Sequence, residues 1–128
     1  MKLLVDTHLL LWSASSPARI SRKTRALLND PNNELFFSAA SLWEISIKNT
    51  LGRDDFSVDN GLLRRGLLDN GWQELAIDGG HAIAVERLPA LHKDPFDRML
   101  VAQAQEEGMV LVTTDKVLQQ YQVTVKLA

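Results

Sequence analysis

Short apolar runs of strand length alternate with longer helical patterns along the chain, and this alternation limits the fold more than any other feature. The predicted strands are Lys2 to Val5, Leu35 to Phe37, Gln73 to Leu75, Met109 to Val112 and Thr124 to Lys126. The predicted helices are His8 to Ala14, Ser21 to Asn29, Ala39 to Leu51, Asn60 to Asp69, Gly80 to Leu88 and Pro95 to Glu107, with a short helical turn after Asp115. Such alternation is typical of parallel βαβ units. The sequence therefore predicts an α/β fold.

The length and composition exclude several classes of protein. A chain of 128 residues has the size of one domain, so we expect a single domain over residues 1–128. The absence of cysteine excludes thiolate metal sites, cysteine nucleophiles and disulfides. The apolar opening is too short for a membrane span and contains Asp6 and His8, so we expect a cytoplasmic protein without a membrane partner.

Two aspartates follow predicted strands directly. Asp6 comes after the first strand, and Asp115 follows the strand Met109 to Val112 and its extension Thr113-Thr114. Open parallel sheets bind ligands outside the carboxyl ends of their strands, near the point where the strand order reverses. We therefore expect Asp6 and Asp115 to face one crevice.

Two further acids lie in apolar helices. Glu44 stands between Trp43 and Ile45, where an uncompensated charge is costly. Asp97 opens the helix that continues as the apolar run 99–102. Taken singly, each acid also fits a structural role: Asp6 and Asp115 as helix caps, Ser41 with Glu44 as a capping box, and Asp94-Pro95 with Asp97 as a helix start.

Taken together, the four acids are explained better as a metal site. Clustered carboxylates repel one another, and without a cation some of them would be forced to bind protons. Mg²⁺ and Mn²⁺ suit an all-oxygen site, and four carboxylates could hold one such ion or two. Centres of this kind stabilise the attacking and leaving oxygens in phosphodiester hydrolysis. We therefore expect Asp6, Glu44, Asp97 and Asp115 to be metal ligands and catalytic residues.

At this point the sequence resembles a known family, the PIN-domain ribonucleases, and within it the VapC-type toxins of type II toxin–antitoxin systems. Four stretches carry the resemblance in family order: Leu4 to Trp12, Ser38 to Ile45, Asp94 to Ala104, and Val112 to Asp115. Asp6, Glu44, Asp97 and Asp115 match the first to fourth acids of the family. The fourth position varies more in the family than the other three.

The resemblance implies a three-layer α/β/α fold with a parallel sheet of about five strands in the order 3-2-1-4-5. It also implies an acidic pocket that binds Mg²⁺ or Mn²⁺, and a metal-dependent endoribonuclease that cuts RNA at single-stranded loops. The implied partners are an antitoxin that inserts a segment into the active-site groove, and a second copy of the toxin in a homodimer that joins a toxin–antitoxin hetero-oligomer.

The sequence also contains residues near the four acids to which it assigns no catalytic role. The roles of Asp94, His8 and His92 are not fixed, and both histidines are left out of the catalytic set. Hydroxyl groups beside the acids are interpreted as caps or turn formers: Thr7, Ser38 and Thr114. The tryptophans are interpreted as core residues: Trp12, Trp43 and Trp72.

With a net charge of −2, RNA binding would depend on local basic patches: Arg19 to Arg25, Arg64-Arg65, and Lys93 with Arg98. The alternatives are a catalytically silent binding module with the same fold and a DNA-directed or phosphatase-like metal hydrolase.

Overall fold

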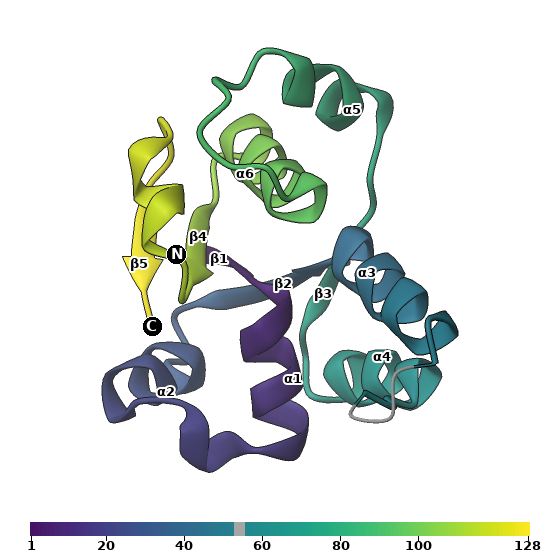
Figure 1. Ribbon diagram of the computed structural model, residues 1–128. Coiled ribbons are helices and arrows are strands. Elements are labelled where there is room, and N and C mark those ends of the chain that lie inside the picture. Colours follow the sequence, from purple (N-terminus) through teal and green to yellow (C-terminus); the bar gives the residue numbers. More distant parts are fainter. Residues whose placement is uncertain (53–55) are drawn as a thin grey trace.

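A parallel sheet with the strand order β3-β2-β1-β4-β5 forms the centre of the molecule (Figure 1). The computed structural model describes residues 1–52 and 56–128. The strands are β1 (Lys2–Val5), β2 (Glu34–Ser38), β3 (Gln73–Leu75), β4 (Val110–Thr113) and β5 (Val125–Leu127). The α-helices are α1 (Thr7–Ser15), α2 (Arg22–Asn29), α3 (Ala39–Thr50), α4 (Asn60–Asp69), α5 (Gly79–Glu86) and α6 (Pro95–Glu107). Two short 3-10 helices are η1 (Pro17–Arg19) and η2 (Lys116–Gln120).

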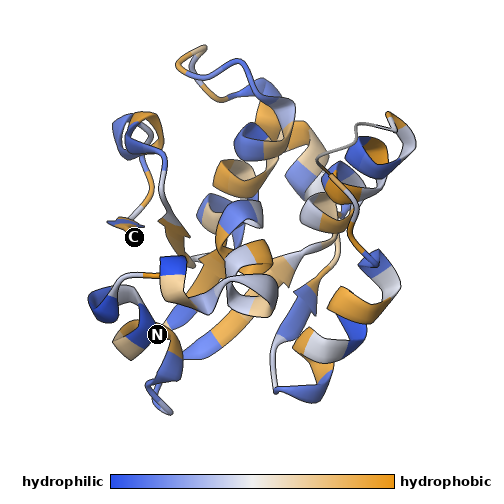
Figure 2. Cartoon of the chain, turned by 60° about the horizontal axis from the view of Figure 1, so that its bottom comes forward, coloured by the Kyte–Doolittle hydropathy of each residue, from blue (hydrophilic) through white to orange (hydrophobic). Residues whose placement is uncertain are grey.

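Helices cover both faces of the sheet because alternate strand residues point to opposite sides. In β1, Leu4 packs into a core with α5 and α6, whereas Leu3 and Val5 pack into a second core with α1, α3 and α4. Hydrophobic residues accordingly colour the central strands in Figure 2, while the helices show both hydrophobic and hydrophilic residues. The α/β class, the three layers and the strand order are therefore confirmed.

The order of the strands reverses at β1, which pairs with β2 on one side and with β4 on the other. Lys2–Val5 is buried along three of its four residues, with Leu3, Leu4 and Val5 at 0% exposure. Chain segments leave the carboxyl ends of β1 and β4 in the same direction, because the two strands are parallel. Residues that directly follow these strands, Asp6 and Thr114, are thereby brought side by side.

The 3-10 helix Pro17–Arg19 was not predicted, and the predicted elements differ from the observed ones at their ends. Thr7–Ser15 is one residue longer at each end than predicted, and Val110–Thr113 is displaced by one residue. The loop predicted from Leu51 to Asp59 falls partly on residues 53–55, which lie outside the described residues. Over the described ranges, the structure has no helix with the length and apolar character that crossing a membrane requires.

Candidate active site

Asp6 is the most rigidly held acid at the carboxyl edge of the sheet. It is 3% exposed, and its Oδ1 accepts a hydrogen bond from the backbone N–H of Leu9 at 3.0 Å, which caps α1. Its Oδ2 accepts from Thr113 Oγ1 at 2.6 Å and from the N–H of Thr114 at 3.3 Å. The expected cap is thus present, and it fixes the carboxylate between β1 and β4.

Glu44 lies inside α3 and faces the start of α1. Its Oε1 and the Ser41 hydroxyl are each 2.9 Å from Thr7 Oγ1, and Lys48 Nζ is 3.1 Å from Oε2. Because a hydroxyl has one proton, we assign the proton of Thr7 to the Glu44 carboxylate, so that Thr7 accepts a hydrogen bond from Ser41.

The predicted capping box of Ser41 and Glu44 at the start of α3 is wrong. Ser38 caps α3 by accepting a hydrogen bond from the N–H of Ala40, so Ser41 and Glu44 both lie within the helix rather than at its cap.

Asp97 is a carboxyl group whose charged form is disfavoured by its surroundings. Burial raises its pKa to about 7, with further increases from the negative charges of Asp94, Asp6 and Glu44 and an opposing effect from His92. Near neutral pH this carboxyl is therefore divided between its charged and protonated forms. The group lies where anions outnumber the cations that face it.

Asp115 differs because His92 compensates its charge. His92 Nε2 is 2.7 Å from Asp115 Oδ2 and 3.4 Å from Asp97 Oδ2. The hydrogen bond from His92 is the main reason that the pKa of Asp115 is lowered, and the N–H of Val117 adds to this effect. Asp115 also caps η2 through that N–H group.

The hydrogen bonds of His92 determine which of its nitrogens carries the proton. Nδ1 accepts from the backbone N–H of Asp94 at 3.0 Å, so the proton of a neutral ring lies on Nε2 and points to Asp115. If Nε2 bound a metal, the proton of the neutral ring would have to lie on Nδ1. There it would face the backbone N–H of Asp94, so two donors would oppose each other. His92 therefore acts as a donor to carboxylates, and sequence reasoning missed it because its contact with Asp115 joins a loop to the end of β4.

The structure brings two of the four predicted acids into one cluster of possible ligand atoms, together with His92. Ligand atoms of His92, Asp97 and Asp115 lie within 4.8 Å of one another, whereas Asp6 and Glu44 lie beyond this group and act on Asp97 through their charges. Carboxylate oxygens are the ligands that Mg²⁺ and Mn²⁺ prefer. Burial and the neighbouring acids both disfavour the charged form of Asp97, and a cation would offset that charge, so the donor set fits a hard divalent cation.

The remaining candidates have structural positions. The Ser38 hydroxyl donates a hydrogen bond to Gln103, a fully buried residue of α6. Thr114 is exposed. His8 is exposed beside Trp12. The prediction that Trp43 lies in the core is wrong, because 60% of it is exposed.

The basic patches are partly occupied by other contacts. Arg64 pairs with Glu74 at 2.6 Å, and Arg98 donates to the carbonyl oxygens of Pro89 and Val85. Arg19 lies 4.4 Å from the ring centroid of Trp12. These contacts hold several of the predicted phosphate-binding cations against the protein itself.

Of two grooves within the part of the chain that the structure describes, the smaller adjoins the acids. The larger, of about 880 Å³, lies between α1, α2 and α4 and contains none of the four predicted acids. The smaller, of about 350 Å³, is lined by Glu44 and Asp94 among others. The location of the acids, rather than groove size, therefore identifies the candidate site.

Three solved structures have similar folds at low sequence identity. The crystal structure of VapBC2 from Rickettsia felis bound to a DNA fragment from its promoter has a TM-score of 0.75 and 13% identity, covering 99% of this chain and 98% of that chain. VapBC-1 from nontypeable Haemophilus influenzae has a TM-score of 0.63 and 17% identity, covering 99% and 98%. DNA-bound VapBC from Salmonella typhimurium has a TM-score of 0.65 and 18% identity, covering 98% and 97%.

The comparisons of sequence give a more specific result. No curated protein sequence matches the chain. A family model described as the PIN domain matches residues 3–123, a range that includes Asp6, Glu44, Asp97 and Asp115. This match agrees with the strand order and with the acids at the edge of the sheet. The chain belongs to the PIN domain family.

Proposed function

We propose that this protein is a metal-dependent endoribonuclease and the toxin of a type II toxin–antitoxin pair. In this proposal Asp6, Glu44, Asp97 and Asp115 hold Mg²⁺ or Mn²⁺ and hydrolyse phosphodiester bonds of RNA. The observation that carries it is the convergence of Asp97 and Asp115, whose ligand atoms lie within 4.8 Å of one another and of His92, with Asp6 and Glu44 near enough for their charges to act on Asp97. Converging carboxylates repel one another, and a divalent cation bound between them would relieve that repulsion.

The chain's own residues prepare the site in distinct ways. Three hydrogen bonds fix Asp6, so its orientation does not depend on a ligand. Lys48 and Thr7 hold Glu44 from opposite oxygens, and His92 orients Asp115 through Nε2. Asp97 receives only the longer contact from His92 and is the least restrained. A bound divalent ion supplies Lewis acidity that activates water and offsets charge on the phosphate.

The structural neighbours support a partner for this nuclease. The Rickettsia, Haemophilus and Salmonella structures are all of VapBC proteins, and those from Rickettsia and Salmonella contain DNA. We include in the proposal a cognate antitoxin, a homodimer within a toxin–antitoxin hetero-oligomer, and a cytoplasmic location. Co-purification of a small protein encoded beside this chain would test the antitoxin.

The central experiment measures cleavage of a labelled single-stranded RNA with Mg²⁺, with Mn²⁺ and with EDTA. We expect cleavage only with a metal ion, and a loss of at least about 1000-fold for Asp97→Asn. Glu107→Gln is the matched control: Glu107 also lies on α6 and also contacts a histidine, His81, but it is not one of the four acids. Its rate should stay within about twofold of the wild type.

Each remaining outcome contradicts part of the proposal. An Asp97→Asn protein as active as the wild type would remove the acids from catalysis. Metal binding in calorimetry without RNA cleavage would indicate a binding module. Equal cleavage of DNA of the same sequence would indicate a hydrolase that does not distinguish the two nucleic acids.

A further inference from the structure

A groove of about 350 Å³ extends from the acidic site between α3 and the first turn of α6. Glu44 and Asp94 line it, so the groove is continuous with the candidate active site. Its apolar lining residues come from both helices: Ile47, Leu51, Pro95 and Phe96. Leu51 is 61% exposed and Ile47 is 36% exposed, which leaves an apolar surface open beside the acids.

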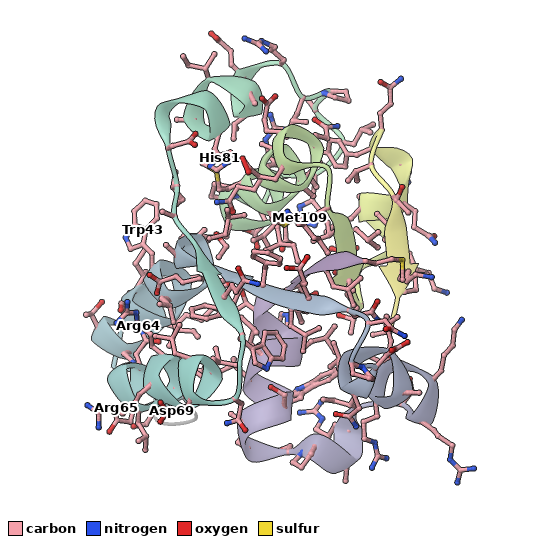
Figure 3. The ribbon with its side chains drawn as sticks, turned by 180° about the vertical axis from the view of Figure 1, so that it is seen from behind. Trp43, Arg64, Arg65, Asp69, His81 and Met109 are labelled. Atoms are coloured by element: carbon pink, nitrogen blue, oxygen red, sulfur yellow. The ribbon has the colours of Figure 1, made fainter. Side chains whose placement is uncertain are left out.

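The aromatic part of this surface is held in place by a second ring. Phe96 directly precedes Asp97 and meets Trp43 at 5.4 Å between centroids, with 79° between the ring planes. Trp43 itself projects from α3 at the edge of the molecule (Figure 3). Perpendicular pairs of this kind are favourable, so Trp43 restrains the ring of Phe96.

Lys48 supplies a cation on the same wall of the groove. Its ammonium group is 3.1 Å from Glu44 Oε2, and 40% of its side chain is exposed. An ammonium group has three protons to donate, so the contact with Glu44 leaves two of them available. The groove thus combines an apolar and aromatic wall with a partly available cation, next to the acids.

We propose that this groove binds one nucleotide of single-stranded RNA next to the phosphate that is cleaved. The base packs on Phe96, Pro95 and Leu51, and the adjoining phosphate accepts hydrogen bonds from Lys48. This inference rests on the proposed nuclease function and adds a recognition site to it. Base stacking on aromatic rings tolerates any sequence, so the groove selects unpaired bases rather than a particular base.

Size, charge and position favour a nucleotide over a protein segment in this groove. Its volume is at the lower end of the range for small-molecule sites, which suits one nucleotide. Lys48 is a cation suited to phosphate at a site otherwise dominated by acids. The groove opens onto Glu44, so a bound nucleotide belongs to the same strand as the phosphate at the acids.

The test measures binding of a labelled eight-nucleotide single-stranded RNA by fluorescence anisotropy in EDTA, where no cleavage is expected. Phe96→Leu and Leu51→Ala should each weaken binding at least about threefold. Lys48→Gln should weaken it and reduce the slope of log affinity against log salt by about 0.7. The matched controls, Leu62→Ala and Lys126→Gln, should bind as the wild type does, since Leu62 is also 61% exposed but lines the other groove, and Lys126 is an exposed lysine of β5 outside the basic patches.

The outcomes separate this inference from the proposed function. Unchanged binding in Phe96→Leu, Leu51→Ala and Lys48→Gln overturns the subsite, as does equally tight binding of duplex RNA. A change in sedimentation of Leu51→Ala without a change in RNA binding shows that the groove contacts another protein chain, and also overturns it. In steady-state cleavage, Leu51→Ala should raise KM with little change in kcat. A wild type that binds RNA through these residues but never cleaves it contradicts the nuclease and leaves the subsite standing.

Discussion

A histidine lies beside each end of α6, and the two rings make the same kinds of hydrogen bond in different surroundings. At its carboxyl end, His81 Nδ1 accepts from the N–H of Asp78 at 3.1 Å and Nε2 lies 3.0 Å from Glu107; Figure 3 shows His81 facing α6. At its amino end, His92 Nδ1 accepts from the N–H of Asp94 at 3.0 Å and Nε2 lies 2.7 Å from Asp115. Both rings therefore carry the neutral-form proton on Nε2.

The difference lies in what surrounds each pair. His81 is 2% exposed, and the side chains of its two acids, Asp78 and Glu107, are 64% and 38% exposed. Water therefore screens those acids, and the contact joins α5 to α6. Around His92 the acids are less exposed and more numerous, and one of them, Asp97, has a pKa of about 7. A contact between a histidine and one carboxylate is thus compatible with a purely structural link between two elements. The candidate active site is distinguished by several partly buried carboxylates that lie close to one another.

The largest expected effect concerns Asp97 in the absence of metal. Its folded-state pKa of about 7 lies above the ordinary value of 3.8, so the folded state binds this proton more tightly than the unfolded state does. The resulting stabilisation is complete below about pH 4 and is lost as the pH rises to about 7. Asp97→Asn removes this loss, so above pH 7 the variant should be more stable than the wild type by about 2–4 kcal/mol.

Urea unfolding in EDTA at several pH values checks this prediction. Glu107→Gln serves as the control at the other end of the helix, and its effect on stability should stay within about 0.5 kcal/mol at every pH. Added Mg²⁺ should stabilise the wild type more than Asp97→Asn. A variant that is less stable than the wild type at pH 8 would mean that Asp97 makes favourable contacts that outweigh its repulsion.

The next effect compares the two histidines directly. His81→Ala leaves a cavity at a buried position and removes the capping interaction at the start of α5, which should cost about 2–3 kcal/mol of unfolding free energy. His92→Ala, at a ring whose side chain is 18% exposed, should cost less than about 1 kcal/mol. Urea unfolding measures both. Equal losses would show that His92 is as much a structural link as His81 is.

The smallest effect is on the titration of Asp115. His92 is the main cause of its lowered pKa, so His92→Ala should raise the pKa of Asp115 towards the ordinary carboxyl value. A lowered pKa stabilises the fold above the ordinary value, and the contribution is lost as the pH falls below it. Carboxyl NMR titration follows the residue, with His81→Ala as the control. An unchanged titration would assign the shift to the N–H of Val117.

Much of the fold followed from local patterns because the two cores are built from regular apolar periodicity. Leu3 and Val5 face one side of the sheet and Leu4 faces the other, as any buried parallel strand requires. Helix starts were less certain, since Ser38 and Ser41 are both plausible caps. In the structure Ser38 is the cap: it lies at the end of β2, directly before α3, and its hydroxyl accepts a hydrogen bond from the N–H of Ala40.

The candidate site was only partly predictable because its supporting contacts join distant segments. Asp6 was identifiable from its place after a strand, but its partner Thr113 was not, since β1 and β4 must first pair. His92 lies in a loop, where no periodicity indicates its direction. Trp43 was misassigned because its apolar neighbours Leu42 and Ile45 are at least partly buried, while its own side of α3 is uncovered.

The hydrogen bond from Thr113 to Asp6 spans 107 residues of chain, and this separation affects when the site can form. During synthesis β1 emerges before β4, so the pairing of the two strands must wait until β4 has left the ribosome. Contacts so distant in sequence also fold slowly compared with local ones. Until then Asp6 lacks the hydrogen bond from Thr113, and Asp97 and Asp115 are not yet positioned at the edge of the sheet. The order of translation therefore delays assembly of the acidic edge until both β1 and β4 have been made.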